Sequence, residues 1–224
     1  MTLYVVPIVE GHTEAGCVER LLQRIWAELL VSPIRLQVLM PSRGKRDALI
    51  DPTKTHLADK IEEAFAKLNQ RLRRDPSGRG LLLLLIDAES DCPAKLAPRL
   101  FKTARSARSD ADIACVLAKR MLENWIVAGA STLAGVNGLA APLTLPDYPE
   151  KCNGAAWLEQ QLRNQKQTRR YKKTADAEVF VRGMSLDPCR AHSPSFDKLC
   201  RELAQRLPPP ETSPDPAPPS PPSK

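Results

Sequence analysis

Residues 81–91 read LLLLLIDAESD, an unbroken apolar run followed by acidic side chains at alternate positions. An element that is apolar at every position is typical of a central parallel strand, because helices cover such a strand on both faces. The acids Asp87, Glu89 and Asp91 follow this strand directly. The stretch therefore predicts a buried parallel sheet with carboxylates at the end of its central strand.

Apolar runs alternate with amphipathic stretches on both sides of this strand. Further strands are predicted at residues 3–9, 34–40 and 112–118. The helical spacing of the apolar residues predicts helices at 13–31, 55–74, 93–107, 119–130, 154–165, 174–183 and 194–206. The basic stretch between the second strand and the helix at 55–74 is predicted to be a loop. This order predicts an α/β fold with a mainly parallel sheet flanked by helices.

The length and composition of the chain predict three segments. A chain of 224 residues is long enough for one main core. We expect an α/β core over residues 1–130 and a helical C-terminal extension packed on it over residues 131–207. Residues 208–224 contain nine prolines and no large apolar side chain, so they are expected to form a disordered tail.

The sequence carries none of the signals of a membrane or secreted protein. No stretch approaches the roughly 20 apolar residues that span a bilayer. The first residues, MTLYVVPIVEG, lack the basic region and the cleavage site of a secretory signal. The six cysteines include no C-x-x-C pair and are expected to be reduced thiols. We therefore expect a cytoplasmic protein without membrane association.

The charge of the chain favours a polyanionic partner such as nucleic acid. Lysine and arginine outnumber the acids by 33 to 26, which gives a net charge of +7. Residues 163–173 concentrate six cations around one tyrosine, with no acid. We expect these cations to contact phosphates and the tyrosine to stack on a base; the residues are Arg163, Lys166, Arg169, Arg170, Tyr171, Lys172 and Lys173. The alternative is that the cations only solvate helix faces.

A second group of acids follows the first predicted strand. Residues 10–14 read EGHTE, so Glu10 comes directly after the strand and Glu14 lies on the first turn of the next helix. Because ligands of open α/β sheets bind at the carboxyl ends of the strands, we expect Glu10 and Asp87 at the same edge. The alternative is that Glu14 caps its helix and that the acids after residue 86 form an ordinary polar turn.

Carboxylates brought together in this way need a proton or a cation. Two like charges about 4 Å apart repel by roughly 4 kcal/mol at an effective dielectric constant of about 20. Ligation by oxygen alone indicates Mg²⁺, Mn²⁺ or Ca²⁺ rather than a soft metal, and Mg²⁺ often leaves water sites for a phosphate substrate. The two acidic motifs therefore predict a metal site for phosphate chemistry.

The two acidic motifs together resemble the Toprim fold, the catalytic domain shared by type IA and type II topoisomerases, bacterial primases and the overcoming-lysogenization-defect nucleases. In more detail, the chain is similar to a small bacterial family of the Toprim clan, the domain of unknown function numbered 4276. The segments that carry this likeness are VEGHTE, LIDAESDCP, LENWIVA, RYKKT and SPSFDKL, in this order along the chain. The resemblance covers about residues 3–206 and implies a Toprim-like (Rossmannoid) sheet.

The resemblance implies a metal-dependent nuclease site that uses one or two Mg²⁺ or Mn²⁺ ions. The residues that match catalytic positions are Glu10, Asp87, Lys172 and Lys173, with either lysine in the role of the family's lysine. Those that match or stand beside metal ligands are Glu10, Glu14, Asp87, Glu89, Asp91 and Glu123. Glu89 occupies the place of the second aspartate of the D-x-D motif, so either Glu89 or Asp91 would replace it.

Glu123 allows a further test of this assignment. It lies in the apolar stretch MLENWIVAGA, where an acid that is buried without a partner is costly. A metal ion would supply a partner, and the resemblance implies this role. The alternative is that Glu123 faces solvent on the polar side of its helix.

The resemblance also implies partners and a setting. Proteins that the chain resembles often occur with an ABC-type or AAA-type ATPase. The chain itself has no G-x-x-x-x-G-K-S/T phosphate loop, so the resemblance implies such an ATPase as a separate partner. The expected substrate is nucleic acid, with DNA favoured over RNA. The expected setting is antiphage defence or genome maintenance. The protein could also form a homo-oligomer. One alternative is a noncatalytic Toprim-like subunit that binds an ATPase or a nucleic acid. Another is a phosphoesterase for a small phosphorylated molecule.

Overall fold

The computed structural model describes residues 1–163 and 170–208, without the side chains of His12 and Thr13. A five-stranded parallel sheet forms its centre, in the order β2-β1-β4-β5, with β3 paired to the end of β1. The strands are β1 (Thr2–Val9), β2 (Arg35–Val38), β3 (Ser42–Arg43), β4 (Arg79–Asp87) and β5 (Ile113–Ala118). The predicted α/β class and the parallel sheet are confirmed.

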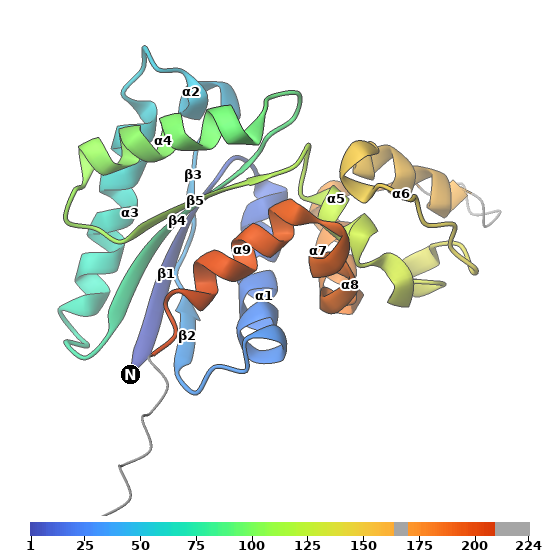
Figure 1. Ribbon diagram of the computed structural model, residues 1–224, viewed down its shortest axis with the longest axis horizontal. Coiled ribbons are helices and arrows are strands. Elements are labelled where there is room, and N and C mark those ends of the chain that lie inside the picture. The colour runs from blue at the N-terminus through green and yellow to red at the C-terminus, as the bar shows by residue number, and fades with distance from the viewer. Residues whose placement is uncertain (164–169, 209–224) are drawn as a thin grey trace, which may run out of the picture.

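Helices cover both faces of the sheet, as Figure 1 shows. On one face lie α3 (His56–Leu72) and α4 (Pro93–Ala107), with the short α2 (Arg46–Ile50) beside them. On the other face lie α1 (His12–Arg24) and α9 (Pro194–Ala204). Because side chains alternate along a strand, Leu84 packs with the first pair of helices and Leu83 with the second. This two-sided burial explains why residues 81–86 are apolar at every position.

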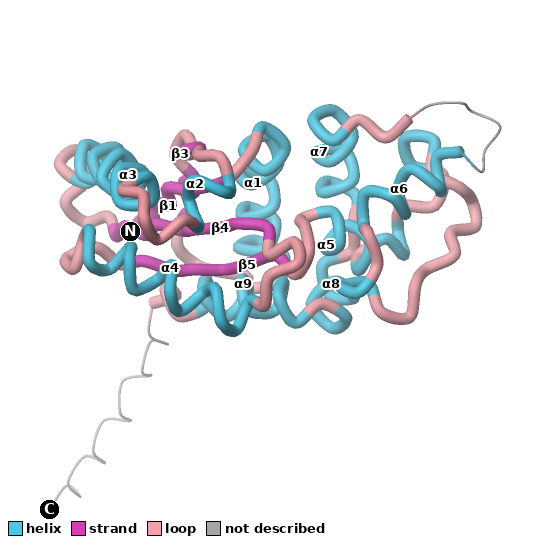
Figure 2. The backbone as a smooth tube through the Cα atoms, turned by 90° about the horizontal axis from the view of Figure 1, so that it is seen from above, coloured by secondary structure: helices cyan, strands magenta, loops and turns pink. Residues whose placement is uncertain are grey.

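A group of short helices lies beyond the carboxyl ends of the strands (Figures 1 and 2). It comprises α5 (Glu123–Ala128), α6 (Gly154–Arg163), α7 (Lys173–Gly183) and α8 (Leu186–His192), with 3-10 turns at Ala130–Thr132, Val136–Gly138 and Pro149–Lys151. Phe180 of α7 and Leu199 of α9 belong to the same apolar cluster as Val116 of the sheet. The helical group is thus continuous with the core of the sheet.

The structure corrects several of the predicted elements. The predicted helix at 13–31 is α-helical only to Arg24 and continues as a π-helix over Ile25–Leu29, where Leu30 N donates to Ile25 O at 3.0 Å. The predicted helix at 119–130 begins only at Glu123, since Arg120 has a φ of 62° that an α-helix does not allow.

Two helices lie where none was predicted. The basic stretch predicted as a loop contains the two-residue strand β3 and α2. Helix α8 was also not predicted, because Pro188 interrupts a short sequence. The proline stands in the first turn, where its missing N–H removes no helical hydrogen bond.

In the described part of the chain, no helix is long and apolar enough to cross a membrane.

Candidate metal centre

Four carboxylates come together beyond the ends of β1 and β4. Glu10 follows β1, and Asp87 is the last residue of β4. Glu14 lies in the first turn of α1, and Glu123 begins α5. The charges of Glu10, Glu14 and Glu123 all act on the carboxyl group of Asp87. The two neighbouring strands therefore bring their acids to one edge, as the sequence predicted for Glu10 and Asp87.

Hydrogen bonds from the main chain fix the two central carboxylates. The backbone N–H of Asp87 donates to Oε1 of Glu10, which holds the end of β1 against the end of β4. Oδ1 of Asp87 in turn accepts from the backbone N–H of Leu122, at 2.9 Å. The side chain of Asp87 thus links the end of β4 to the segment that leads into α5.

Burial makes Glu10 and Asp87 costly to ionise. The side chains of Asp87, Glu14 and Glu123 are nearly or fully buried, with Glu123 at 0% exposure. Burial, followed by the charges of Glu10, Glu14 and Glu123, raises the pKa of Asp87 well above its usual value. Burial also raises the pKa of Glu10 to about 7, despite the hydrogen bond from Asp87. The raised pKa values favour the protonated forms of Glu10 and Asp87 when no cation is present.

Glu123 is fully buried, so the alternative that it faces solvent is wrong. Its Oε1 lies 3.2 Å from Nζ of Lys173 and accepts a hydrogen bond from the hydroxyl of Tyr171 at 3.4 Å. Its Oε2 is buried and has no hydrogen-bond partner among the described residues. Such an orphaned carboxylate oxygen leaves one strong acceptor open within the cluster.

A glycine allows the close packing that encloses Glu123. Helix α6 begins at Gly154, directly against the start of α5. A Cβ atom at Gly154 would lie 2.7 Å from the backbone N of Asn124 and 2.7 Å from the carbonyl carbon of Glu123. Any other residue at this position would push α6 away from the start of α5.

Lys173 supplies the cluster with a positive charge. Burial would lower the pKa of its ammonium group, but the neighbouring Glu123, with Asp87 and Glu14, outweighs this effect and raises the pKa. Tyr171 stays protonated, because burial and the charge of Glu123 raise the pKa of its hydroxyl. Its ring stacks on Phe180 with the centroids 6.4 Å apart. Both side chains belong to the segment predicted to contact nucleic acid.

Glu89 and Asp91 form a second group around Arg46 of α2. The guanidinium of Arg46 pairs with Asp91 and lies 3.4 Å from Oε2 of Glu89. It also donates to the main-chain oxygens of Asp87 and Ala88, at 3.0 Å each. The predicted ligands Glu89 and Asp91 are thus held in the loop after β4 by a cation. The sequence did not predict this role of Arg46, because it depends on a tertiary contact.

The remaining described residues of the basic segment lie at the end of α6 and before α7. Lys172 and Arg170 are exposed, and Arg163 forms an ion pair with Glu159 at 2.7 Å. Oε2 of Glu159 also accepts from the backbone N–H of Tyr171, so α6 is tied to the start of α7. The predicted contacts Lys166 and Arg169 lie outside the described residues. Of the described cations in this segment, Lys173 contacts the carboxylate cluster, while Arg163 is paired with Glu159.

The carboxylates are gathered but do not form a complete coordination shell. Within residues 1–163 and 170–208, no three His, Cys, Asp or Glu side chains are already arranged around one ion position. Glu123 instead pairs with Lys173, while Glu10 and Asp87 accept hydrogen bonds from the main chain. An ion would have to draw these side chains inward.

A comparison with known protein families matches residues 9–204 to one family, described as a domain of unknown function (DUF4276). The chain belongs to the DUF4276 family. No curated protein and no solved structure matches the chain. The part that matches DUF4276 includes every candidate site residue, from Glu10 to Lys173.

The stability of the DUF4276 protein should fall with rising pH when no metal is present. Glu10 has a pKa of about 7 in the folded state against its ordinary 4.5, so the folded state binds more protons between these values. The unfolding free energy therefore falls as the pH rises from about 4.5 to about 7, and the raised pKa of Asp87 adds to this fall. Urea unfolding in chelator at pH 5 and pH 8 measures this difference.

The Glu10→Gln variant should show a smaller fall, because it removes this carboxyl group and one charge beside Asp87. Glu178→Gln is the matched control, since Glu178 is a partly exposed carboxylate paired with Arg182 on α7. It should keep the wild-type dependence on pH. If the unfolding free energy falls equally in wild type and Glu10→Gln between pH 5 and pH 8, ionisation of Glu10 does not destabilise the folded state.

Proposed function

We propose that the protein is a metal-dependent, Toprim-like nuclease that cleaves phosphodiester bonds of nucleic acid. The observation that carries this proposal is a cluster of four carboxylates at the carboxyl ends of parallel strands, of which Glu14, Asp87 and Glu123 are buried and Glu123 is paired with Lys173. Ligands of open α/β sheets bind at this edge. A structural ion pair would need one acid for one lysine, whereas this site has acids in excess.

The donor set fits Mg²⁺ or Mn²⁺. All candidate ligand atoms are carboxylate oxygens, which these hard cations prefer, and the orphaned Oε2 of Glu123 is an open acceptor. Glu10, Glu14, Asp87 and Glu123 would hold the ion. When bound, it would lower the pKa of an attacking water and stabilise charge on the leaving oxygen.

The protein's own groups would orient the reaction. Asp87 is held by the N–H of Leu122, and Glu10 by the N–H of Asp87, so both carboxylates are aimed before the substrate arrives. Lys173 is positioned by Glu123 and would bind a phosphate oxygen, offsetting charge that develops there. Lys172 lies beside it on the exposed rim and would contact a neighbouring phosphate.

A second ion would require a rearrangement of the loop after β4. Glu89 stands where the Toprim pattern has its second aspartate, and Arg46 now holds both Glu89 and Asp91. One of these acids would have to leave Arg46 to become a ligand. We therefore propose one ion in the buried cluster and a second only with substrate.

The wider assignment follows from the likeness to Toprim nucleases. The exposed cations beside the site favour nucleic acid over a small phosphorylated molecule, with DNA as the proposed substrate. An ABC-type or AAA-type ATPase would act as a separate partner in antiphage defence or genome maintenance. The proposed location is the cytoplasm.

The competing proposal is a noncatalytic Toprim-like subunit that binds an ATPase or a nucleic acid. The pairing of Arg46 with Glu89 and Asp91 favours it, because this cation occupies two of the expected ligands. In this case the buried acids would stay protonated or paired with Lys173, and metal would not stabilise the fold.

Melting temperatures with and without millimolar Mn²⁺ or Mg²⁺ distinguish the two proposals. An ion that binds only the folded state at 100 times its dissociation constant adds about 2.7 kcal/mol to the unfolding free energy. We expect the melting temperature of the wild type to rise, and that of Glu123→Gln to rise much less. Glu178→Gln should respond as the wild type does. No rise in the wild type, either alone or with a DNA oligonucleotide present, would favour the binding subunit.

A further inference from the structure

The sheet has an open edge at β5. This strand stands last in the strand order, and β4 is its partner on one side. Leu82 N donates to Asp112 O at 2.9 Å and Ala88 N to Ala118 O at 2.8 Å, so the even-numbered residues of β5 face β4. The backbone groups of Ile113, Cys115 and Leu117 therefore point away from the sheet. Among the described residues, no hydrogen bond reaches these outward groups.

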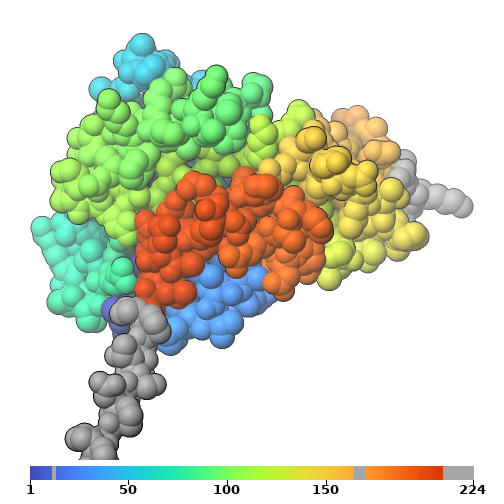
Figure 3. All heavy atoms as spheres, viewed as in Figure 1, coloured from blue at the N-terminus to red at the C-terminus, as the bar shows by residue number. Residues whose placement is uncertain are grey.

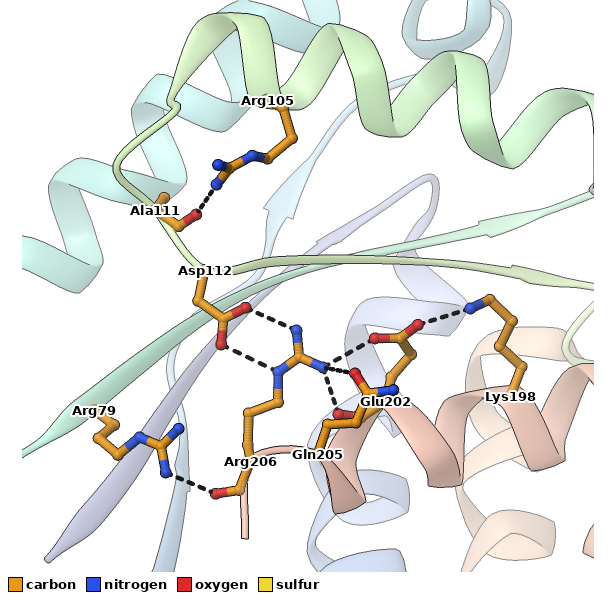
Figure 4. Close-up of polar contacts among 8 residues, drawn as sticks. All are labelled: Arg79, Arg105, Ala111, Asp112, Lys198, Glu202, Gln205 and Arg206. Carbon is orange, nitrogen blue, oxygen red and sulfur yellow. Dashed lines mark hydrogen bonds and ion pairs between the residues drawn. The ribbon is translucent and has the colours of Figure 1, made fainter. Parts of the chain in front are cut away.

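Side chains close this edge at both ends but not in the middle. Before β5, Nη1 of Arg105 donates to the backbone oxygen of Ala111 at 2.7 Å (Figure 4). After β5, the backbone N–H of Lys119 donates to Oγ of Ser195 at 3.1 Å. Between these two points, Ile113, Cys115 and Leu117 are 5%, 6% and 4% exposed and line the groove described below. An unpaired edge of this kind is a template for another strand.

A groove gives access to the open edge. It lies between α4 and α9, which adjoin each other on the face shown in Figure 3 (green and red). One part has a volume of about 580 Å³ and includes Phe101 of α4 and residues 112–115 of the strand segment. A second part of about 390 Å³ reaches Leu117 and Lys119. Ala97, Pro98 and Lys198 line both parts, so the groove follows the length of β5.

The walls of the groove are fixed before any partner binds. Figure 4 shows Arg206, after α9, directed at Asp112 at the start of β5. Its Nε and Nη2 donate to the two carboxylate oxygens of Asp112 at 3.1 and 2.7 Å. Its Nη1 donates to Glu202, which also pairs with Lys198 at 2.7 Å. These contacts tie the end of α9 to the start of β5 and so fix one end of the groove.

We propose that this groove binds an extended acidic segment of a partner protein, which adds a strand to β5. The outward N–H and C=O groups of Ile113, Cys115 and Leu117 would pair with its main chain. Phe101, whose side chain is 40% exposed, would contact an apolar residue of the segment. This binding site is separate from the carboxylate cluster and does not depend on the proposed nuclease activity.

The charge of the groove favours an acidic occupant. Five cations line it, against three acids. The cations are Arg105, Lys119, Lys198, Arg201 and Arg206, and the acids are Asp112, Glu150 and Glu202. Asp197, the partner of Arg201, adds a fourth acid at the groove, so the cations exceed the acids by five to four and an acidic segment would meet a small net positive charge.

The shape of the groove excludes the closest alternatives. A second copy could not bring its own β5 to this edge, because both strands lie recessed between their helices α4 and α9. The chain's own residues 208–224 hold nine prolines, and a proline has no N–H to donate to a strand. An extended segment of another protein is narrow enough to enter the groove, and it can donate backbone N–H groups if it lacks proline.

Fluorescent peptides test this proposal directly on the full chain. The probe is a pool of nine-residue peptides in which valine and threonine alternate with aspartate and glutamate, and the matched pool carries lysine in place of the acids. We expect saturable binding of the acidic pool, measured by anisotropy, and at least tenfold weaker binding of the lysine pool. Methylation of alternate backbone nitrogens of the acidic peptides should remove the binding. Absence of binding by the acidic pool would overturn the proposal.

Two pairs of variants locate the binding. Ala97→Trp fills the groove from α4 and should weaken peptide binding at least tenfold, whereas Lys102→Trp on the exposed side of α4 should not. If Ala97→Trp does not fold, Lys198→Glu replaces it, with Lys102→Glu as its control. Equal binding by the groove variant and its control would overturn the proposal. So would displacement of the probe by a peptide of residues 208–224, or a dimer that Ala97→Trp dissociates.

Discussion

Asp87→Asn should abolish metal-dependent cleavage while the protein stays folded. Asparagine keeps the shape of the side chain, and its Oδ1 can still accept the hydrogen bond from the N–H of Leu122. It removes the charge that would bind the ion, in a buried site where such an interaction is worth several kcal/mol. We expect the cleavage rate to fall by roughly a thousandfold or more. The measurement is the rate of cleavage of labelled DNA in Mg²⁺ or Mn²⁺.

The same variant should melt at a higher temperature than wild type in chelator. It removes a carboxylate that Glu10, Glu14 and Glu123 repel, so the metal-free fold loses a source of strain. Asp110→Asn is the control, because Asp110 is an exposed aspartate paired with Arg108. It should change neither the cleavage rate nor the melting temperature in chelator. Wild-type cleavage by purified Asp87→Asn would place the activity outside this cluster.

Arg206→Met should produce a large loss of stability. Arg206 is nearly buried, and its guanidinium joins Asp112 before β5 to Glu202 of α9. Breaking a buried ion pair costs about 3–5 kcal/mol, but the side chain of Asp112 is 42% exposed and water screens part of this. We therefore expect a loss of roughly 1–3 kcal/mol in the unfolding free energy, measured by urea denaturation.

Arg201→Met provides the comparison for this prediction. Arg201 also lies on α9 and pairs with Asp197, but its side chain is 61% exposed. Its replacement should cost at most about 1 kcal/mol, because exposed pairs contribute little. Equal losses in the two variants would show that Arg206 does not hold α9 to the sheet.

The sheet could be predicted from the sequence because its signal is local. Residues 81–86 are apolar at every position, and this alone indicates a strand covered on both faces. The π-helix at Ile25–Leu29 could not be predicted, since its residues have the same apolar spacing as an α-helix. Helix α8 was missed for a different reason, because one proline in a short sequence outweighs the rest of the pattern.

Only part of the candidate site could be predicted from the sequence. The approach of Glu10 to Asp87 follows from a rule about neighbouring parallel strands, and the structure brings the two side chains together. The burial of Glu123 depends on α6 and on the close packing that Gly154 allows. The pairing of Arg46 with Asp91 joins residues 45 positions apart. Neither contact leaves a pattern in the local sequence.

Helix α9 packs against β5, although it is synthesised much later than that strand. The hydrogen bond from Lys119 to Ser195 spans 76 positions, and the pair of Asp112 with Arg206 spans 94. The ribosome therefore completes all five strands long before the helix that covers β5 exists. Until α9 emerges, Ala114, Val116 and Ala118 lack part of their apolar cover. The nascent sheet is therefore partly uncovered until α9 is synthesised. The exposed apolar surface makes the unfinished chain prone to aggregate, which is the condition that chaperones counteract.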